Sequence, residues 1–486
     1  MPKNVSSLDL ALNQRPKHVT LSRWLYEELR RAVLDRRLAP GTRLPATRDF
    51  ALQYGVSRGT VVTVFEQLQA EGYLIGRAGV GTRVNELLSK SPFPKMKGAP
   101  RIPKIPPVLR GLPISRPARP FRPYEPALNE FPTEIWARVA ARRFRCASSS
   151  LLAGGDPRGY APLRQAIAAY LGSSRGVNCS ADSVVILSGA QQGLDLLARI
   201  LIKPGEPVWI EDPAYFGASA AFRNAGARII PVPVDEFGLV VSQGKQTCVQ
   251  PKVAYVTPAH QCPLGVTMSL ERRLALLEWA RRAGAFVIED DYDSEYRFEG
   301  RPVPALQGLD KSNSVIFLGS FSKVLFPSLR LGYVVLPPTL MDRVLALRVG
   351  VDLCPSTLNQ AVLCDFMAEG HLGRHVRRMR EMYTARLAAL HDGARRYLSG
   401  LIEISPVRAG LNTAGFLQNG MTSQQAESCA ANQGIEAMGF NRFKLSTTRV
   451  EGLLIGFAAF SEREIGRGVV SLAAALEHGS PKSRKR

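Results

Sequence analysis

Short apolar runs alternate with longer amphipathic runs through the middle of this 486-residue chain, and the alternation narrows the folds that the chain can adopt. We assign strands to residues 183–187, 207–210, 253–257, 285–288 and 315–318, and helices to residues 191–201 and 270–282. Strands that alternate with helices build an α/β sheet with helices on both faces. Ligands of such sheets gather where the parallel strands end. The residues that follow these strands are therefore the first candidates for a functional site.

A lysine, two serines and an arginine follow the last of these strands. Lys323 comes just after Ser320 and Ser322, and Arg330 lies a few residues further on. A lysine in a dry pocket can lose its proton and form a Schiff base with an aldehyde, whereas hydroxyl groups and a guanidinium suit a phosphate. Pyridoxal phosphate carries both groups. The stretch therefore predicts a covalent site for this cofactor, with ordinary solvated loop charges as the alternative.

Three other strand ends carry groups that suit the same cofactor. The turn at 188–191 lies between a strand and a helix, where free backbone N–H groups and the helix dipole attract a phosphate. Asp290 could keep a pyridinium nitrogen protonated, and Tyr292 could donate to a phenolic oxygen. Tyr215 could stack on a planar ring. Plain turn chemistry, solvated acids and a core tyrosine are the alternatives at these positions.

The first 85 residues carry the pattern of a small helical domain with a hairpin. We assign helices to 21–37, to 46–54 and to the residues after Ser57, and strands to 73–75 and 82–84. This order predicts a winged helix-turn-helix, whose third helix enters the major groove of DNA by its N-terminal end. That end offers bases and phosphates the residues Ser57, Arg58, Gly59 and Thr60. A small helical cap with solvated charges is the alternative.

A proline-rich and basic stretch at 86–126 separates this domain from the α/β region. Such a composition predicts an extended, semi-stiff spacer without a core. The chain is thus expected to contain a DNA-binding domain at 20–85, a linker at 86–126, a ligand-binding domain at 127–478 and a disordered basic tail at 479–486.

Charge and cysteine content bear on partners and compartment. Lys and Arg number 63 and Asp and Glu 41, so the net charge of +22 attracts polyanions such as nucleic acid or acidic lipid. The seven cysteines include no C-x-x-C pair, which argues against a zinc site or a disulfide framework and favours a reducing cytoplasm. Because no apolar run approaches the roughly 18 residues that span a bilayer, we expect no membrane partner.

Four stretches of the amino-terminal segment, at 38–48, 55–61, 68–74 and 79–82, closely resemble the GntR family of bacterial transcription regulators. The resemblance implies that double-stranded operator DNA is a partner. It also implies that certain residues touch that DNA: Arg48, Arg58 and Thr60, with Arg77 and Gly79 in the wing. Val62 departs from the pattern, because many GntR relatives carry a second arginine there.

The rest of the chain resembles the fold-type I pyridoxal phosphate enzymes, and among them the aminotransferase-like domain of the MocR-type GntR regulators. The matching motifs stand, in the family's order, at 188–192, 211–215, 257–265, 272–274, 288–295 and 320–323. The resemblance implies that Lys323 forms the Schiff base, Asp290 pairs with the pyridine nitrogen, Tyr292 contacts the ring oxygen and Tyr215 stacks on the ring. It gives as phosphate ligands Ser188, Gly189, Ala190, Gln191, Ser320, Ser322 and Arg330.

Two departures from the aminotransferase pattern concern the ligand. The usual Asn-Pro-x-Gly loop is replaced by residues 260–265, so His260 or Gln261 would take the role of the asparagine that bonds the ring oxygen. Aminotransferases of this fold also grip the α-carboxylate of the substrate with a C-terminal arginine. Arg449 or Arg442 could serve as that group here, and Arg223 could also face the ligand.

Together these resemblances imply a pyridoxal-phosphate-dependent transcription regulator of the MocR type. It would sense an amino compound, or the cofactor itself, through Lys323. The resemblance further implies a homodimer paired head to tail. The first alternative is a catalytically active aminotransferase that carries an incidental DNA-binding head. The second is a DNA-binding protein whose large domain has lost the cofactor and only dimerises.

Overall fold

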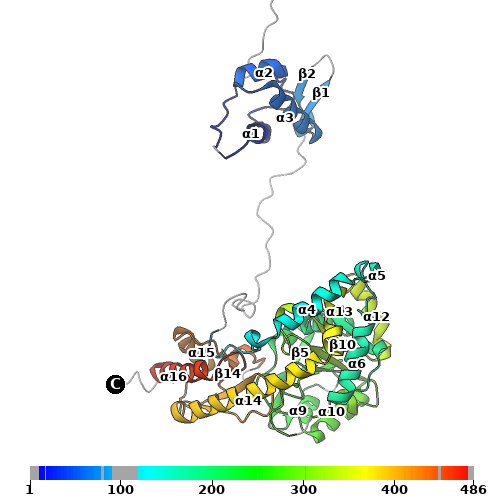
Figure 1. Ribbon diagram of the computed structural model, residues 1–486, viewed down its shortest axis with the longest axis vertical. Helices are drawn as coiled ribbons and strands as arrows, with labels where there is room; N and C mark the ends of the chain where they lie inside the picture. Colours follow the sequence, from blue (N-terminus) through cyan, green and yellow to red (C-terminus); the bar gives the residue numbers. More distant parts are fainter. Residues whose placement is uncertain are drawn as a thin grey trace, which may run out of the picture. The chain divides into compact units, whose positions relative to one another are not determined.

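The computed structural model describes residues 10–16, 18–77, 81–89, 119–248, 250–300, 303–446 and 450–479. The chain divides into two compact units, residues 1–105 and residues 106–486 (Figure 1). Most of the expected linker, Gly79 in the wing, Arg449 and the basic tail from 480 onward lie outside the described residues, as does the side chain of Arg77. No helix within the described ranges is long and apolar enough to span a bilayer.

The amino-terminal unit has the expected winged helix-turn-helix order. Its elements are α1 (Leu21–Leu34), α2 (Thr47–Tyr54), α3 (Arg58–Ala70), β1 (Leu74–Arg77), β2 (Gly81–Val84) and the 3-10 turn η1 (Glu86–Ser89). The helices meet around a core that includes Leu25, Phe50 and Phe65. Gly55 ends α2 in the left-handed conformation, φ 63°, which glycine adopts without strain. The first helix ends three residues before the predicted Arg37, because the chain turns at Arg36, φ 59°.

The carboxy-terminal unit is built on an eight-stranded sheet, as the alternation of strands and helices predicted. Its strands are β3 (Val184–Leu187), β4 (Pro207–Asp212), β5 (Arg228–Asp235), β6 (Gly238–Leu239), β7 (Val253–Val256), β8 (Phe286–Asp291), β9 (Val315–Ser320) and β10 (Gly332–Val335). Their order across the sheet is β3-β10-β9-β8-β7-β4-β5-β6. The five strands from β9 to β5 are parallel, and β10 is antiparallel to both of its neighbours.

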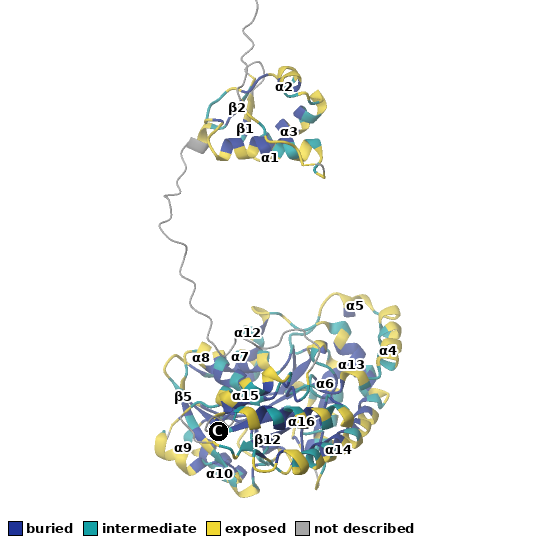
Figure 2. Ribbon diagram, turned by 90° about the vertical axis from the view of Figure 1, so that its left-hand side faces the viewer, coloured by how far each residue is buried: buried dark blue, intermediate teal, exposed yellow. Residues whose placement is uncertain are grey.

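Helices cover both faces of this sheet because successive strand residues point to opposite sides. Along β9, Ile316 and Leu318 face the core under α7 (Ala190–Leu201), α8 (Phe216–Asn224) and α12 (Pro338–Val349). The opposite face packs against α6 (Ala161–Arg175), α10 (Leu270–Ala283) and α13 (Thr357–Ala368). Figure 2 shows the result, with buried strands inside and exposed residues on the outer sides of the helices.

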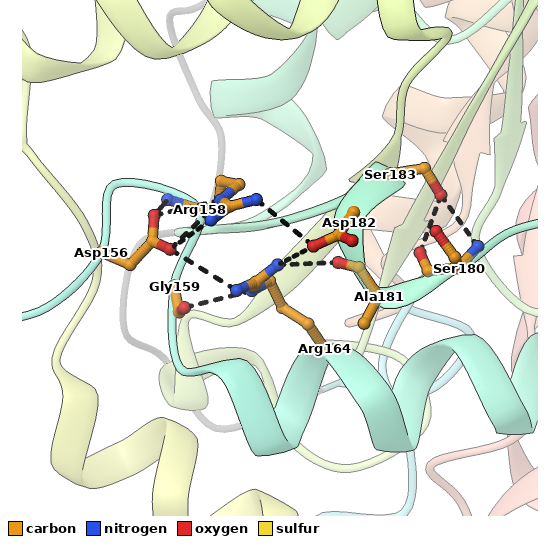
Figure 3. A network of polar contacts seen from close by, with 8 residues as sticks. All are labelled: Asp156, Arg158, Gly159, Arg164, Ser180, Ala181, Asp182 and Ser183. Carbon is orange, nitrogen blue, oxygen red and sulfur yellow. Dashed lines mark hydrogen bonds and ion pairs between the residues drawn. The ribbon is translucent and has the colours of Figure 1, made fainter.

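A polar network fixes the entry to the edge strand β3 (Figure 3). The buried Arg164 on α6 donates to the carbonyl of Ala181 at 2.8 Å and reaches Asp156 at 3.5 Å. Arg158 bonds the same Asp156 carboxylate, and its own carbonyl accepts from the N–H of Ile186 in β3 at 2.8 Å. This network anchors the strand that leads into the 188–191 turn.

A second, four-stranded antiparallel sheet of order β11-β12-β14-β13 completes the unit. Its elements are β11 (Ile402–Ile404), β12 (Asn412–Leu417), β13 (Met438–Gly439), β14 (Gly452–Gly456), α15 (Ser423–Asn432) and α16 (Glu462–Gly479). The long α14 (His371–Tyr397) runs from the larger sheet to this one (Figure 1).

The end of the predicted linker is part of this folded unit, which corrects the boundary at 126. Phe121 is fully buried, and its carbonyl accepts from the N–H of Gly456 in β14 at 3.0 Å. Arg122 forms an ion pair with Glu436. The prediction failed because prolines and arginines dominate the composition of this stretch, whereas one buried phenylalanine is enough to anchor it.

Candidate functional site

A cavity of about 300 Å³ opens where the parallel strands of the large sheet end. Its lining consists of Tyr124, Gly189, Ala190, Gln191, Tyr215, Phe216, Tyr255, Cys262, Asp290, Tyr292, Ser320, Ser322, Lys323, Pro327 and Arg330. Most residues singled out from the strand ends therefore meet in one place. The carboxyl edge brings them together because β8 and β9 run parallel and side by side.

Lys323 lies against the backbone of Tyr124 in this cavity. Its Nζ donates to the Tyr124 carbonyl oxygen at 2.8 Å and lies 5.2 Å from the centroid of the Tyr124 ring. Burial lowers the pKa of the Lys323 ammonium to about 8, because desolvation disfavours the charged form. At neutral pH an appreciable fraction of this amine is therefore uncharged and nucleophilic, as a lysine that attacks a carbonyl must be.

Asp290 is held with one carboxylate oxygen free. Its Oδ2 accepts a hydrogen bond from the Tyr255 hydroxyl at 2.8 Å, whereas the buried Oδ1 has no hydrogen-bond partner among the described residues. Burial raises the pKa of the Asp290 carboxyl to about 7. A protonated ring nitrogen would supply both the positive charge and the N–H donor that this site lacks. The residues present thus fit a pyridine ring at this place.

The opposite part of the cavity suits a phosphate. Gly189 precedes α7 with φ 127°, and a Cβ at this position would lie 3.3 Å from a guanidinium nitrogen of Arg330. The first backbone N–H groups of α7 and the Arg330 guanidinium thus border one small space. Ser320 and Ser322 add hydroxyl groups, and the Ser320 Oγ accepts from the Ser322 N–H at 3.1 Å.

The substitution Asp290→Asn should stabilise the cofactor-free protein more at pH 8 than at pH 5. The Asp290 carboxyl has a pKa of about 7 in the folded state and an ordinary value of about 3.9 in the unfolded chain. Between these two pH values the folded state keeps a proton that the unfolded chain has lost. The wild type therefore loses stability as pH rises through this window, and the uncharged asparagine does not. The difference in Tm between variant and wild type should grow by roughly 2–4 °C in thermal unfolding at the two pH values.

Glu278→Gln is the matched control for this comparison. Its exposed carboxyl has a pKa lowered to about 2 by hydrogen bonds from Arg281 and Arg282, so its ionisation is complete well below pH 5. The Tm difference between this variant and wild type should be the same at pH 5 and pH 8. An equally constant difference for Asp290→Asn would contradict the assignment of a raised pKa to Asp290.

Three predicted cofactor ligands are not among the residues that line the cavity, and two of them bond to neighbouring loops. The Ser188 hydroxyl is directed to Asp352 at 3.5 Å. The Gln261 amide donates to the carbonyls of Pro213 and Cys262, each at 2.8 Å. Both side chains thus hold the surrounding loops, which corrects their proposed roles at the phosphate and at the ring oxygen.

His260 is the third, and it supports a residue that lines the cavity. Its Nδ1 lies 3.0 Å from Asp293 Oδ1 and 3.3 Å from the Tyr292 hydroxyl. Tyr292 does line the cavity, so it stays a candidate for contact with the ring oxygen. His260 instead orients the Tyr292 hydroxyl from behind.

Arg442 and Arg223, two of the arginines proposed for a ligand carboxylate, are not among the residues that line this cavity. Arg442 pairs with Glu427, Nε to Oε1 at 2.7 Å, which corrects its proposed role. Arg223 lies exposed in the last turn of α8. Arg449 falls outside the described residues.

Several lining residues were not found from the sequence, and Tyr255 is the one with a usable signal. It lies in β7 opposite Ile288 of β8, so its side chain shares a side of the sheet with Asp290, two residues on. Tyr124 sits in the stretch expected to be a linker. Phe216 and Pro327 belong to none of the matching motifs, and Cys262 lies in the 260–265 loop without a predicted role at the ligand.

Within the described residues, the amino-terminal unit places Ser57, Arg58, Gly59 and Thr60 at the start of α3 and Arg48 on α2. Ser57 caps α3 by accepting from the Thr60 N–H at 3.1 Å, and the two hydroxyls lie 2.8 Å apart. Arg58 and Gly59 are exposed in the first turn of α3, and Arg48 is exposed on α2. The N-terminal end of the third helix is thus free to enter a groove.

Two family models match the two units. Residues 21–84 match "Bacterial regulatory proteins, gntR family", and residues 127–470 match "Aminotransferase class I and II". The probable rhizopine catabolism regulatory protein MocR of Rhizobium meliloti is 38% identical over 469 residues, which are 95% of each chain. The chain is a MocR-type regulator of the GntR family. The pyridoxine biosynthesis regulator PdxR of Corynebacterium glutamicum is 30% identical and covers 98% of this MocR-type chain and all of its own.

The solved structures similar to this MocR-type regulator include aminotransferases. The Pyrococcus horikoshii kynurenine aminotransferase, in complex with PMP, has a TM-score of 0.69 and 28% identity over 74% of this chain and 90% of its own. LysN of Thermus thermophilus, an α-aminoadipate aminotransferase complexed with N-(5'-phosphopyridoxyl)-L-leucine, has the same TM-score and 29% identity over 74% and 92%. The cofactor of this MocR-type domain is accordingly pyridoxal 5'-phosphate.

Proposed function

We propose that this regulator senses an amino compound, or pyridoxal phosphate itself, at Lys323 and changes its affinity for operator DNA in response. Pyridoxal phosphate, when bound, supplies an aldehyde to which an amine can attach, and one attached amine can be exchanged for another. The ring next to this aldehyde withdraws electrons. Lys323 would be the amine of the protein, and Asp290 would hold the ring nitrogen through its Oδ1. Tyr215 and Tyr292 would border the ring. The residues that would hold the phosphate are Gly189, Ala190, Gln191, Ser320, Ser322 and Arg330.

One observation carries the coupling between ligand and DNA. The carbonyl that accepts from Lys323 belongs to Tyr124, at the end of the chain segment that leads to the amino-terminal unit. A Lys323 amine that is not bound to the cofactor has all its N–H groups available to donate to the Tyr124 carbonyl, whereas a cofactor-bound amine has fewer. The state of Lys323 therefore acts directly on the segment 119–126. A ligand shifts a two-state equilibrium only when it binds the two states unequally, and this hydrogen bond provides such a difference.

We propose further that the protein acts in the cytoplasm as a homodimer, the head-to-tail arrangement that its family resemblance implies. Large apolar side chains are exposed on the carboxy-terminal unit, as a surface that pairs with a second copy would require. They include Phe144, Leu152, Val349, Val351 and Leu353.

The visible spectrum of the purified protein, followed while amines are added, tests this function. With pyridoxal phosphate the protein should show a Schiff-base band, and one amine should shift that band to a stable new position. The same amine should change the affinity for operator DNA by about fivefold or more in fluorescence anisotropy. Such a result supports the sensor, and an absent band after incubation with the cofactor would exclude both a sensor and an enzyme.

A catalytically active aminotransferase is the second candidate function. The observation that favours it is the joint presence of Lys323 and Asp290 in one cavity of a domain whose fold is similar to that of a kynurenine aminotransferase. In the same titration it predicts steady bleaching of the band by an amino donor and recovery with a 2-oxo acid. Turnover of about 1 per second or more would support an enzyme.

A further inference from the structure

Tyr124 is a neighbour of the Lys323 amine through both its backbone carbonyl and its ring. The carbonyl oxygen accepts from Lys323 Nζ at 2.8 Å, and the ring centroid lies 5.2 Å from the same nitrogen. Any ligand that brings its own amine to this place has to fit beside the phenol ring. Tyr124 is therefore a direct neighbour of the reacting position.

Three further contacts hold this ring in place. The Tyr124 hydroxyl lies 2.9 Å from Cys262 Sγ, and the backbone N–H of Tyr124 donates to Asn412 Oδ1 at 2.7 Å. The ring meets Tyr292 edge to face, with centroids 6.3 Å apart and an interplanar angle of 73°. Burial raises the pKa of the Cys262 thiol, so the thiol stays neutral as a partner of the hydroxyl. The side chain is thus fixed at its tip, its ring and its backbone.

The backbone of Tyr124 has a conformation that favours glycine. Its φ is +64°, in the left-handed region that bulky residues rarely occupy. A residue without a side chain would adopt this backbone with less strain. Residues with such a strained backbone cluster at active sites and ligand sites. Tyr124 fits this rule, because its side chain lines the cavity.

We propose that Tyr124 is the ligand-selecting residue of this site. Its ring restricts the space beside Lys323, so that slender primary amines reach the lysine and branched or cyclic amines do not. The remaining space is small, because a cavity of about 300 Å³, at the low end of the roughly 300–1,000 Å³ usual for ligand pockets, must also admit the cofactor. Phe216 and Cys262 also line the cavity with apolar surface. This inference rests on the proposed binding of amines at Lys323.

The test compares a slender amine with a cyclic one in wild type and in Tyr124→Gly. Apparent dissociation constants of ethylamine and cyclohexylamine are measured from the visible spectrum of the full chain loaded with pyridoxal phosphate. Glycine keeps the backbone conformation and removes the ring. The ratio of the cyclohexylamine constant to the ethylamine constant should fall by about tenfold or more in Tyr124→Gly. Effects of the substitution that are common to both amines cancel in this ratio.

Tyr124→Phe is the control, since it keeps the ring and loses only the contact with Cys262; its ratio should equal that of wild type. Tyr124→Asn, which also tolerates positive φ, replaces Tyr124→Gly if the glycine variant does not fold by circular dichroism. An unchanged ratio in the glycine or asparagine variant overturns the selecting role. Failure of the proposed function is a separate result, because the wild type itself would then form no band with pyridoxal phosphate, or a band that neither amine shifts.

Discussion

Replacing Lys323 with alanine should abolish the visible band formed with pyridoxal phosphate and every spectral response to amines. Lys323 is the only lysine that lines the cavity among the described residues, so no neighbouring amine can take its place. Asp290 and Arg330 would still hold the ring and the phosphate, but the covalent link would be lost. We expect the dissociation constant of the cofactor to rise by about 100-fold or more, which corresponds to ~3 kcal/mol. Equilibrium dialysis measures this constant without relying on the band.

Lys311→Ala provides the matched control, because Lys311 is exposed on a loop and does not line the cavity. It should leave the band and the cofactor affinity unchanged. If Lys323→Ala responded to the effector amine and bound DNA as wild type does, the large unit would act as a cofactor-free dimerising body. The proposal that the regulator senses its ligand through Lys323 would then be wrong.

The lining residues that could be predicted from the sequence are those at the ends of strands. Lys323 and Asp290 each follow a short apolar run, and parallel strands leave the sheet at one edge, so their proximity follows from pattern and geometry together. The 188–191 turn also follows a strand, and three of its residues line the cavity beside Lys323 and Asp290. A strand pattern does not indicate which side chains after the strand point inward, and Ser188 and Gln261 bond to loops instead.

Residues that reach the cavity from distant segments were beyond such reasoning. Tyr124 comes from a proline-rich stretch whose composition gives no sign of burial, and its anchor Phe121 is a single residue. The small antiparallel sheet was missed for a related reason: β11 and β13 are too short to show a period of two. Long-range contacts decide these positions, and local patterns do not record them.

Replacing Arg58 with alanine should weaken binding to operator DNA by about 10- to 100-fold, the effect expected for one arginine at a base or a phosphate. Arg58 is the first residue of α3, and the exposed end of this helix is the part that enters the major groove in a winged helix-turn-helix. A suitable probe is a duplex that the wild-type protein selects from a random pool. Fluorescence anisotropy at several salt concentrations gives the affinity and its salt dependence.

Arg23→Ala separates a specific contact from a general loss of positive charge. Arg23 is exposed on α1 and pairs with Glu27 at 3.1 Å, so this variant removes the same unit charge from a different helix. It should change the affinity by less than about threefold, because exposed ion pairs contribute little. A phosphate contact at Arg58 should also lower the slope of log K against log salt by about one. Equal losses in Arg58→Ala and Arg23→Ala would mean that the net charge of the whole chain, +22, attracts DNA without any base contact from α3.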